Sequence, residues 1–116
     1  MSNRQWSEVK GNIFDVQHPS SSEKEYFEAL VNNNEIQIER IISQGHVTPE
    51  GEWYDQERDE WVVLVTGEAS ILLEGEKEIT LIAGDYLFIP KHLRHRVTYT
   101  SKEPVCIWLA IHGNLQ

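Results

Sequence analysis

Two segments of this 116-residue sequence carry side chains that can transfer protons or bind a ligand. The first is Tyr54–Glu60, which reads YDQERDE and leads into an apolar run. The second, GDYLFIPKHLRH, covers residues 84–95 and contains two histidines. Imidazole and carboxylate groups are the side chains that most often exchange protons near neutral pH. Glu60 and His95 are therefore candidate catalytic residues, and Tyr99, in the segment that follows His95, is a third.

Composition and missing motifs argue against several other kinds of protein. The chain has 19 acidic residues against 10 Lys and Arg, and this net charge of −9 argues against a protein that binds nucleic acid through a basic surface. It has no run of the ~20 apolar residues that a membrane span needs and no apolar leader, so we expect a cytoplasmic protein without a membrane partner. A Gly-rich phosphate loop, a Cys-x-x-Cys pair and a Gly-x-Ser-x-Gly elbow are all missing. The single cysteine, Cys106, stands in an apolar run and is interpreted as a buried residue.

The elements that must position the candidate residues follow a period of two. Ile36, Ile38 and Ile42 alternate with polar residues in EIQIERIIS, which is typical of a half-buried strand. Further short segments follow at intervals of roughly 8–12 residues: EWVVLVT, ASILLE, EITLI and YLFIP, which Gly turns separate, then the basic segment HRVTYT and finally VCIWLAIH. This pattern predicts one all-β domain over residues 1–116, with a barrel from about 35 to 112. A closed barrel removes exposed strand edges and commonly holds one small ligand.

A short strand and a helix are predicted before the barrel, over residues 12–31. Asn12–Val16 (NIFDV) reads as the strand. Ser22 and Glu25 have the spacing of a capping box, and an apolar stripe follows at helical spacing. We therefore expect a helix over residues 22–31, packed outside the barrel and ended by three consecutive asparagines.

The motifs resemble those of the cupins, a family of small double-stranded β-helix barrels. The resemblance covers about residues 36–112 and rests on two motifs: E-x6-G, from Glu60 to Gly67, and GD-x3-IP-x4-H, over residues 84–95. It implies a jelly-roll-like barrel of the small, single-domain, phosphomannose-isomerase-like type. In cupins, imidazoles and one carboxylate from neighbouring strands converge inside the barrel on a divalent ion, and positions stay open for water or substrate.

The first cupin motif departs from the family pattern because this sequence has no His-x-His. With three residues between that pair and Glu60, Tyr54 and Gln56 stand in its place. These three positions share parity along a strand, so their side chains can face one side without a bulge. In this preferred alignment the resemblance implies Gln56, Glu60 and His95 as metal ligands, with Tyr54 as a fourth oxygen or a hydrogen-bond donor. Because Gln is a feeble ligand for transition metals, the site would be weaker than one with three histidines.

A spacer of four residues instead places Trp53 and Asp55 at the His-x-His positions. Asp55 is a better ligand than Gln, but this alignment needs an extra bulge and a Trp in a ligand position. Two later positions also differ: His92 stands where the family prefers Gly, and Tyr99 where it often has Asn. His92 is either a turn residue at the barrel mouth or a second imidazole near the ligand, so it joins the candidate ligand-binding residues: Tyr54, Asp55 and His92. The remaining histidines are expected at the surface or the mouth: His18, His46 and His112.

Three functions are consistent with the sequence. The first is a cupin that binds a small polar metabolite and uses a divalent metal ion of unknown identity, as an enzyme of unknown substrate. The second is a metal-free binding or sensor module that holds its ligand by hydrogen bonds. The third is a metal-independent isomerase or epimerase in which His95 is the base, with Glu60 or Tyr99 nearby. Small cupins often dimerise, so we also expect a homodimer in which the NIFDV strand pairs with a sheet edge of the partner.

Overall fold

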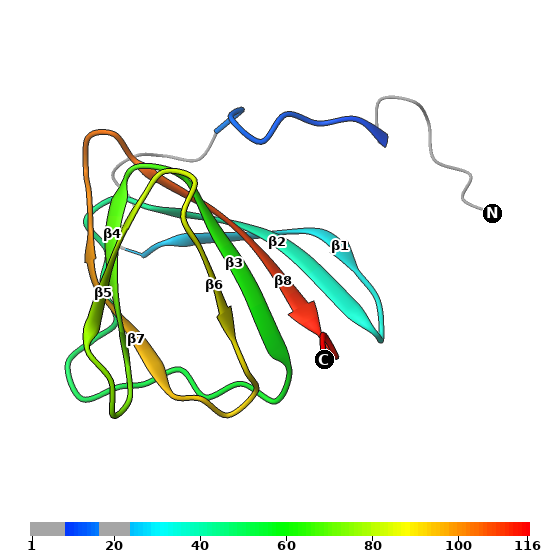
Figure 1. Ribbon diagram of the computed structural model, residues 1–116. Coiled ribbons are helices and arrows are strands. Elements are labelled where there is room, and N and C mark those ends of the chain that lie inside the picture. The colour runs from blue at the N-terminus through cyan, green and yellow to red at the C-terminus, as the bar shows by residue number, and fades with distance from the viewer. Residues whose placement is uncertain (1–8, 17–23) are drawn as a thin grey trace.

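The computed structural model describes residues 9–16 and 24–116, and the elements that it defines are β-strands (Figure 1). The described part has eight of them: β1 Tyr26–Asn32, β2 Ile36–Ser43, β3 Asp59–Thr66, β4 Glu68–Leu73, β5 Glu78–Ile82, β6 Tyr86–Ile89, β7 His95–Thr100 and β8 Cys106–Gly113. The all-β fold predicted from the sequence is confirmed. Over these residues there is no helix with the length and apolar character that a membrane span requires.

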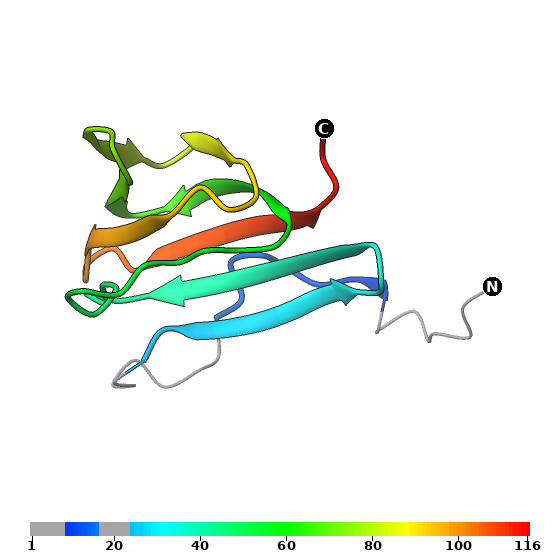
Figure 2. The ribbon, with the colours of Figure 1, turned by 90° about the horizontal axis from the view of Figure 1, so that it is seen from below.

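The strands form two antiparallel sheets that face each other as the two sides of a flattened barrel (Figures 1 and 2). One sheet has five strands in the order β1-β2-β8-β3-β6, and the other has three in the order β5-β4-β7. Strand β8 lies between β2 and β3 and pairs with both. The smaller sheet is extended at β7, where Tyr54 forms an isolated bridge with His95. The segment before β3 therefore pairs with the smaller sheet, whereas β3 itself belongs to the larger one.

The core lies between the sheets and is built from the side chains that alternate along each strand. On β3, Val62 and Leu64 belong to the buried cluster, together with Ile71 of β4 and Trp108 of β8. Burying each such side chain contributes about 1.5–3 kcal/mol to stability. Glu60 shares the inward parity of Val62 and is itself buried. The apolar core therefore gives way to polar side chains at the start of β3.

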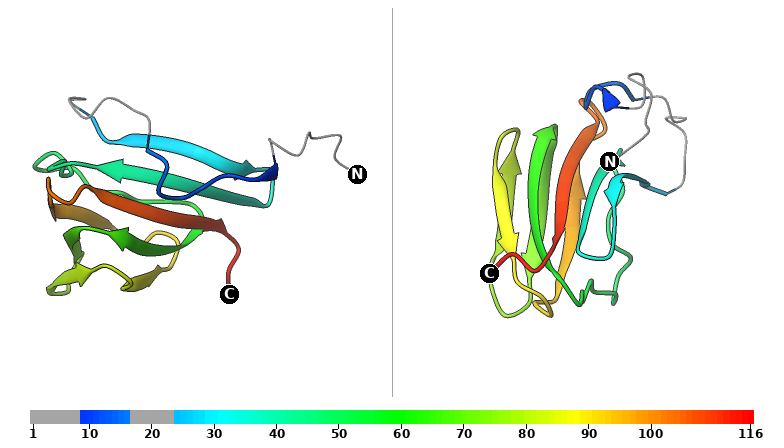
Figure 3. Two further views of the ribbon diagram at one scale, coloured as in Figure 1. Left: turned by 90° about the horizontal axis from the view of Figure 1, so that it is seen from above. Right: turned by 90° about the vertical axis from the view of Figure 1, so that its right-hand side faces the viewer.

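The strand predicted at Asn12–Val16 is wrong, because this segment forms a turn. The Asn12 side chain accepts a hydrogen bond from the backbone N–H of Phe14 at 2.8 Å, and the N–H of Asp15 donates to the Asn12 carbonyl at 3.0 Å. Asn favours such turns by bonding to the backbone two residues on. The segment lies on the outer side of β2 (Figure 3), where the buried Arg40 guanidinium donates to two of its carbonyls at 3.1 and 2.8 Å.

The helix predicted over residues 22–31 is also wrong, although residues 22 and 23 lie outside the described part. The remainder belongs to strand β1 and the residues before it, and β1 pairs with β2. A bulge between Ala29 and Val31 shifts the register, which breaks the period of two and gave the apolar residues a helical spacing. Pairing with β2 outweighs the local helical preference. The three asparagines form the hairpin turn, in which the Asn33 side chain accepts two backbone hydrogen bonds.

Candidate functional site

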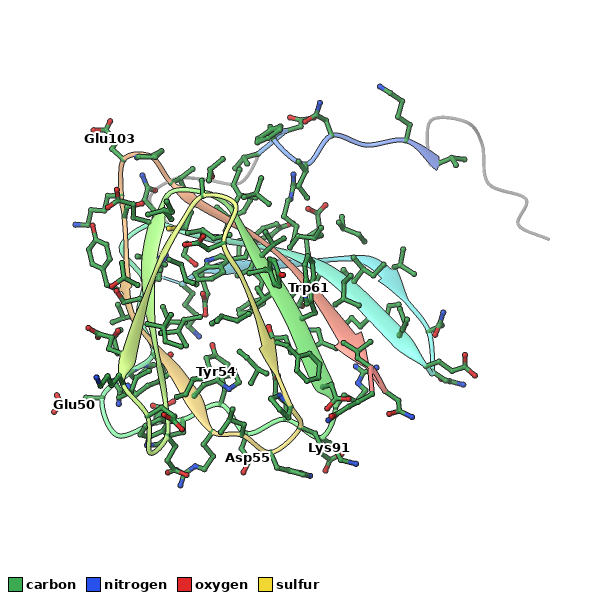
Figure 4. All side chains as sticks on the ribbon, viewed as in Figure 1. Glu50, Tyr54, Asp55, Trp61, Lys91 and Glu103 are labelled. Atoms are coloured by element: carbon green, nitrogen blue, oxygen red, sulfur yellow. The ribbon has the colours of Figure 1, made fainter. Side chains whose placement is uncertain are left out.

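A cavity between the two sheets contains the residues that the sequence analysis selected. The free space between its walls is about 500 Å³, a figure that includes open solvent at the mouth. Its polar lining residues are Glu25, Glu39, Tyr54, Gln56, Glu60 and His95. In Figure 4 the Tyr54 side chain lies between the sheets, while Asp55 and Lys91 lie at the end of the barrel.

The most enclosed polar side chains of the cavity are those of Glu60 and His95. Glu60 is the second residue of β3 and His95 the first of β7, so each sheet contributes one of them. Their side chains are 8% and 7% exposed, and His95 Nε2 lies 3.6 Å from Glu60 Oε1. This distance is too long for a hydrogen bond, and Glu60 Oε1 has no hydrogen-bond partner among the described residues. A buried carboxylate oxygen without a donor costs about 1–3 kcal/mol or more, so the cavity suits a ligand that donates a hydrogen bond there.

The imidazole of His95 is held in one orientation. Its Nδ1–H donates to the Leu93 carbonyl at 2.9 Å, which leaves Nε2 facing Glu60. The ring stacks on that of Tyr54 with centroids 5.6 Å apart, and the two backbones exchange hydrogen bonds of 2.8 and 3.1 Å. Burial lowers the pKa of His95, but its interactions with Glu60, the Leu93 carbonyl and the charge of Asp55 raise it more. The net pKa is raised, so the imidazolium persists to higher pH than in a free histidine.

A second polar chain crosses the cavity wall through Tyr54. The Tyr54 hydroxyl donates to Glu25 Oε1 at 3.0 Å, and the Ser43 hydroxyl donates to Glu25 Oε2 at 3.1 Å. Trp108 Nε1–H in turn donates to the Ser43 hydroxyl at 3.2 Å. Burial raises the pKa of Tyr54, and the negative charges of Glu25, Glu60 and Glu39 raise it further. Tyr54 is therefore a fixed hydrogen-bond donor and not a phenolate ligand.

A second buried acid–imidazole pair, Glu39 and His112, backs the same cavity. Glu39 Oε1 and His112 Nε2 lie 2.9 Å apart, with side chains 12% and 8% exposed. The expectation that His112 lies at the surface or mouth is wrong, because its position on β8 faces inward, opposite Glu60. The sequence analysis missed Glu39, although it stands two residues before the cavity-lining Ile41 on the same face. It also missed Glu25, because the segment was interpreted as a helix.

Three of the selected residues lie away from the cavity lining. His92 Nδ1 and Asp55 Oδ1 form a pair at 2.9 Å, with side chains 61% and 49% exposed. His92 has a φ of 65°, in the left-handed region that favours glycine, which explains why this turn position suits Gly. Tyr99 is exposed although it shares parity with His95, because a register shift between Ser70 and Ile71 of β4 turns it outward.

The side chains of the cavity that could act as metal ligands show whether a divalent ion, the cofactor implied by the resemblance, fits there. Among the described residues, no three His, Cys, Asp or Glu side chains form a metal-binding group. Both carboxylate oxygens of Glu25 and of Glu39 have hydrogen-bond partners, so Glu60, His95 and the weak ligand Gln56 remain. Catalytic zinc sites have three strong protein ligands, and this set has two. The residues therefore do not fit a tightly held transition-metal ion, and a weak site at Gln56, Glu60 and His95 stays a prediction.

Comparison with known proteins gives a matching family model and similar solved structures. A family model described as "Cupin domain" matches residues 41–112. The structure of a "putative mannose-6-phosphate isomerase" from Ralstonia eutropha JMP134 is 42% identical, covers 90% of this chain and 97% of its own, and has a TM-score of 0.85. No curated protein matches the sequence.

Two more distant structures share the fold. A cupin superfamily protein from Desulfitobacterium hafniense DCB-2 is 20% identical, with coverages of 85% and 84% and a TM-score of 0.69. An RmlC-like cupin family protein with a double-stranded β-helix fold, from Methanocaldococcus jannaschii, is 18% identical, with coverages of 90% and 94% and a TM-score of 0.66.

Proposed function

The chain belongs to the cupin domain family, and on that premise we propose that its cavity binds a small polar molecule through Glu60 and His95, without a resident metal ion. The observation that carries this proposal is Glu60 Oε1, a carboxylate oxygen that is buried in the cavity wall and has no hydrogen-bond partner within residues 9–16 and 24–116. A folded protein rarely leaves such an atom unpaired unless a ligand or an ordered water completes it.

The geometry of the pair suggests what the ligand offers. Glu60 Oε1 accepts hydrogen bonds and the protonated His95 Nε2 donates them, and the 3.6 Å between the two atoms leaves room for a ligand atom beside both. A ligand hydroxyl can donate to Glu60 and accept from His95 at the same time. Both side chains are nearly buried, so water competes weakly with the ligand for these contacts.

A binding screen tests the proposal. The protein is treated with a chelator and exposed to neutral polyols, organic cations and organic anions, and its melting temperature is measured. A ligand that binds the folded state raises it. We expect Glu60→Gln and His95→Gln to lose this rise, and the matched variant Glu68→Gln, on an exposed residue at the start of β4, to keep it. A ligand that stabilises all four proteins equally, or only after metal is added, would contradict the proposal.

A metal-independent isomerase is the second candidate, and the acid–base character of the Glu60–His95 pair favours it. Such a pair can take a proton from the carbon beside a carbonyl and return it to the neighbouring carbon, with no oxidant or reductant. The relative from Ralstonia eutropha is named for mannose-6-phosphate isomerase, so aldose–ketose isomerisation of mannose and its 6-phosphate is the assay to run in the presence of chelator. Loss of either side chain should reduce kcat by roughly 10²-fold or more. Turnover that Glu60→Gln leaves unchanged would exclude this role.

The weak divalent-ion site has a test of its own. If Gln56, Glu60 and His95 bind the ion, calorimetric titration with Mn²⁺ or Zn²⁺ should show the largest loss of affinity in His95→Ala, because imidazole is the strongest donor of the three. Gln56→Ala should weaken binding less. The alternative alignment expects the reverse, with Asp55→Ala damaging and Gln56→Ala silent. Wild-type protein that binds no better than His95→Ala would exclude the metal site.

A further inference from the structure

The ionisable side chains that line the cavity are unequal in charge. Glu25, Glu39 and Glu60 are acids, and His95 is the basic side chain among the lining residues. They come from separate parts of the chain: Glu25 precedes β1, Glu39 lies on β2 and Glu60 on β3. The cavity is thus ringed by carboxylates on one sheet and faces a single imidazole on the other. Even with His95 protonated, the wall carries more negative than positive charge.

The carboxylates act on the same region of space. Tyr54 stacks on His95 and donates its hydroxyl to Glu25. The charges of Glu25, Glu60 and Glu39 each add to the effect of burial in raising its pKa. The protein as a whole carries a net charge of −9, which adds attraction for cations at long range. An anion that entered this cavity would meet repulsion from several sides.

Two arginines of this part of the barrel, Arg94 and Arg96, are engaged in other contacts. The guanidinium of Arg94 is 3.0 Å from the Glu74 carboxylate, and Arg96 Nη2–H donates to the Thr48 carbonyl at 3.2 Å. Both guanidinium groups lie over the ring of Trp53, at 5.4 and 5.9 Å from its centroid. Neither residue lines the cavity. They therefore do not supply an anion site within it.

A second observation, on the Glu60 side chain, points to a ligand independently of the charge of the cavity wall. Glu60 is 6% exposed and lines the cavity, and its Oε1 atom has no hydrogen-bond partner in the part of the chain that the structure describes. This oxygen is a ready acceptor for an N–H or O–H group of a bound molecule. The neighbouring carboxylates would strengthen the attraction if that molecule were positively charged.

The aromatic lining separates an organic cation from a metal ion. Phe27, Tyr54 and Trp108 line the cavity together with the carboxylates, and aromatic rings attract ammonium groups. A metal ion needs several free donor atoms converging on one point, which Glu25 and Glu39 cannot supply because their oxygens are hydrogen-bonded. An ammonium group has a diffuse charge and is stabilised by carboxylates spread around it, whether or not their lone pairs are engaged.

We propose that the ligand of this cavity is a small organic cation, a protonated amine that carries at least one N–H group. This inference rests on the proposed function, which makes the cavity the binding site, and it adds the sign of the ligand's charge. Glu60 is the direct acceptor, Glu25 and Glu39 supply the surrounding negative charge, and the aromatic side chains contact the alkyl groups. Phosphorylated sugars are disfavoured by the same charges.

Three compounds that share a tert-butyl group and differ in charge test the inference: tert-butylammonium, neutral tert-butanol and anionic pivalate. Calorimetric titration of the full chain in chelator should show that tert-butylammonium binds most tightly and pivalate least. Glu25→Gln and Glu39→Gln should each weaken tert-butylammonium binding on the order of tenfold, because each removes one charge from the wall and keeps the shape of the side chain. Glu68→Gln, the same change outside the cavity, should have no effect, and added salt should weaken tert-butylammonium binding more than tert-butanol binding.

The outcomes distinguish this inference from the proposed function. If neutral or anionic ligands bind in a way that Glu60→Gln abolishes, while tert-butylammonium does not bind, the cation inference fails and the proposed function stands. If no compound binds, both fail. Tert-butylammonium affinity that survives Glu25→Gln and Glu39→Gln also overturns the inference, as does binding of Mn²⁺ without binding of tert-butylammonium. Circular dichroism of each variant confirms that the barrel is intact.

Discussion

Replacing the Glu60–His95 pair by apolar side chains should separate its cost to stability from its use in binding. In the single variant His95→Phe, the Glu60 carboxylate stays nearly buried without its cationic neighbour. Removing one partner of a buried pair typically costs about 3–5 kcal/mol. Because the side chains here are 7% and 8% exposed, water relieves little of this cost, and we expect a loss of about 3 kcal/mol. Glu60→Met should cost less, since the imidazole left behind can become neutral.

The double variant Glu60→Met/His95→Phe has no buried charge at this position. Apolar replacements of buried pairs are often neutral or stabilising by about 1–4 kcal/mol. Glu60 Oε1 accepts no hydrogen bond from any residue that the structure describes, so the native pair is incompletely satisfied. We therefore expect the double variant to be at least as stable as the wild type. The double variant should no longer bind the ligand. Any stability that it gains over the wild type measures how much the native pair costs the folded protein in return for binding.

Urea unfolding of the four proteins at pH 7 measures this double-mutant cycle, with the m-value as a check that the unfolded states are comparable. The exposed pair Arg94 and Glu74, with side chains 43% and 47% exposed, is the control cycle and should give a coupling of about 1 kcal/mol or less. Additive effects of the two core changes, or a double variant less stable than His95→Phe, would refute the reasoning.

Three further predictions follow from the fold. The pKa of His95 in the folded protein is raised above its usual 6.5. Its contribution to stability is therefore present below about pH 6.5 and is lost as the pH rises through the folded pKa. Urea unfolding across this range should show a smaller loss in the free energy of unfolding for Glu60→Gln than for the wild type. Gly67→Ala should cost roughly 2–4 kcal/mol of stability, since φ is +91° and a Cβ would lie 2.7 Å from the Cys106 sulfur. Gly75→Ala, at φ +80° in open space, should cost only about 1–2 kcal/mol. Equal melting temperatures of the two variants would contradict this. We also expect a homodimer, because the outer face of the larger sheet exposes aromatic side chains; sedimentation at micromolar concentration should give about twice 13.5 kDa, and a monomer mass would count against it.

Strand β3 was predictable because its more buried and less buried side chains alternate, so the period of two is visible in the residue types. Strand β8 has buried residues on both faces and was predicted from its short apolar run. Where the alternation is broken, the prediction failed. The bulge in β1 gave Phe27 and its neighbours a helical spacing, and the shift in β7 turned Tyr99 outward although it shares parity with His95. Bulges depend on which strand lies opposite, and this is long-range information that a local pattern does not contain.

Parity identified Tyr54, Gln56 and Glu60 as one set, and the structure has all three in the cavity lining. It could not identify the second pair in the same way. Glu39 and His112 are far apart in the sequence and meet only because β2 lies beside β8. Their polar character suggested the surface, and only the partner on the neighbouring strand makes their burial favourable.

The position of β8 between β2 and β3 has a consequence for the order in which the barrel forms. Ile36 pairs with Gly113 and Asp59 also pairs with Gly113, so the middle of the larger sheet is supplied by a segment made long after its neighbours. Until β8 has been synthesised, β2 and β3 each have one unpaired edge, and unpaired strand edges bind other chains readily. Closing these distant contacts is slow, so nascent chains that lack β8 are the species most exposed to aggregation and most dependent on chaperones.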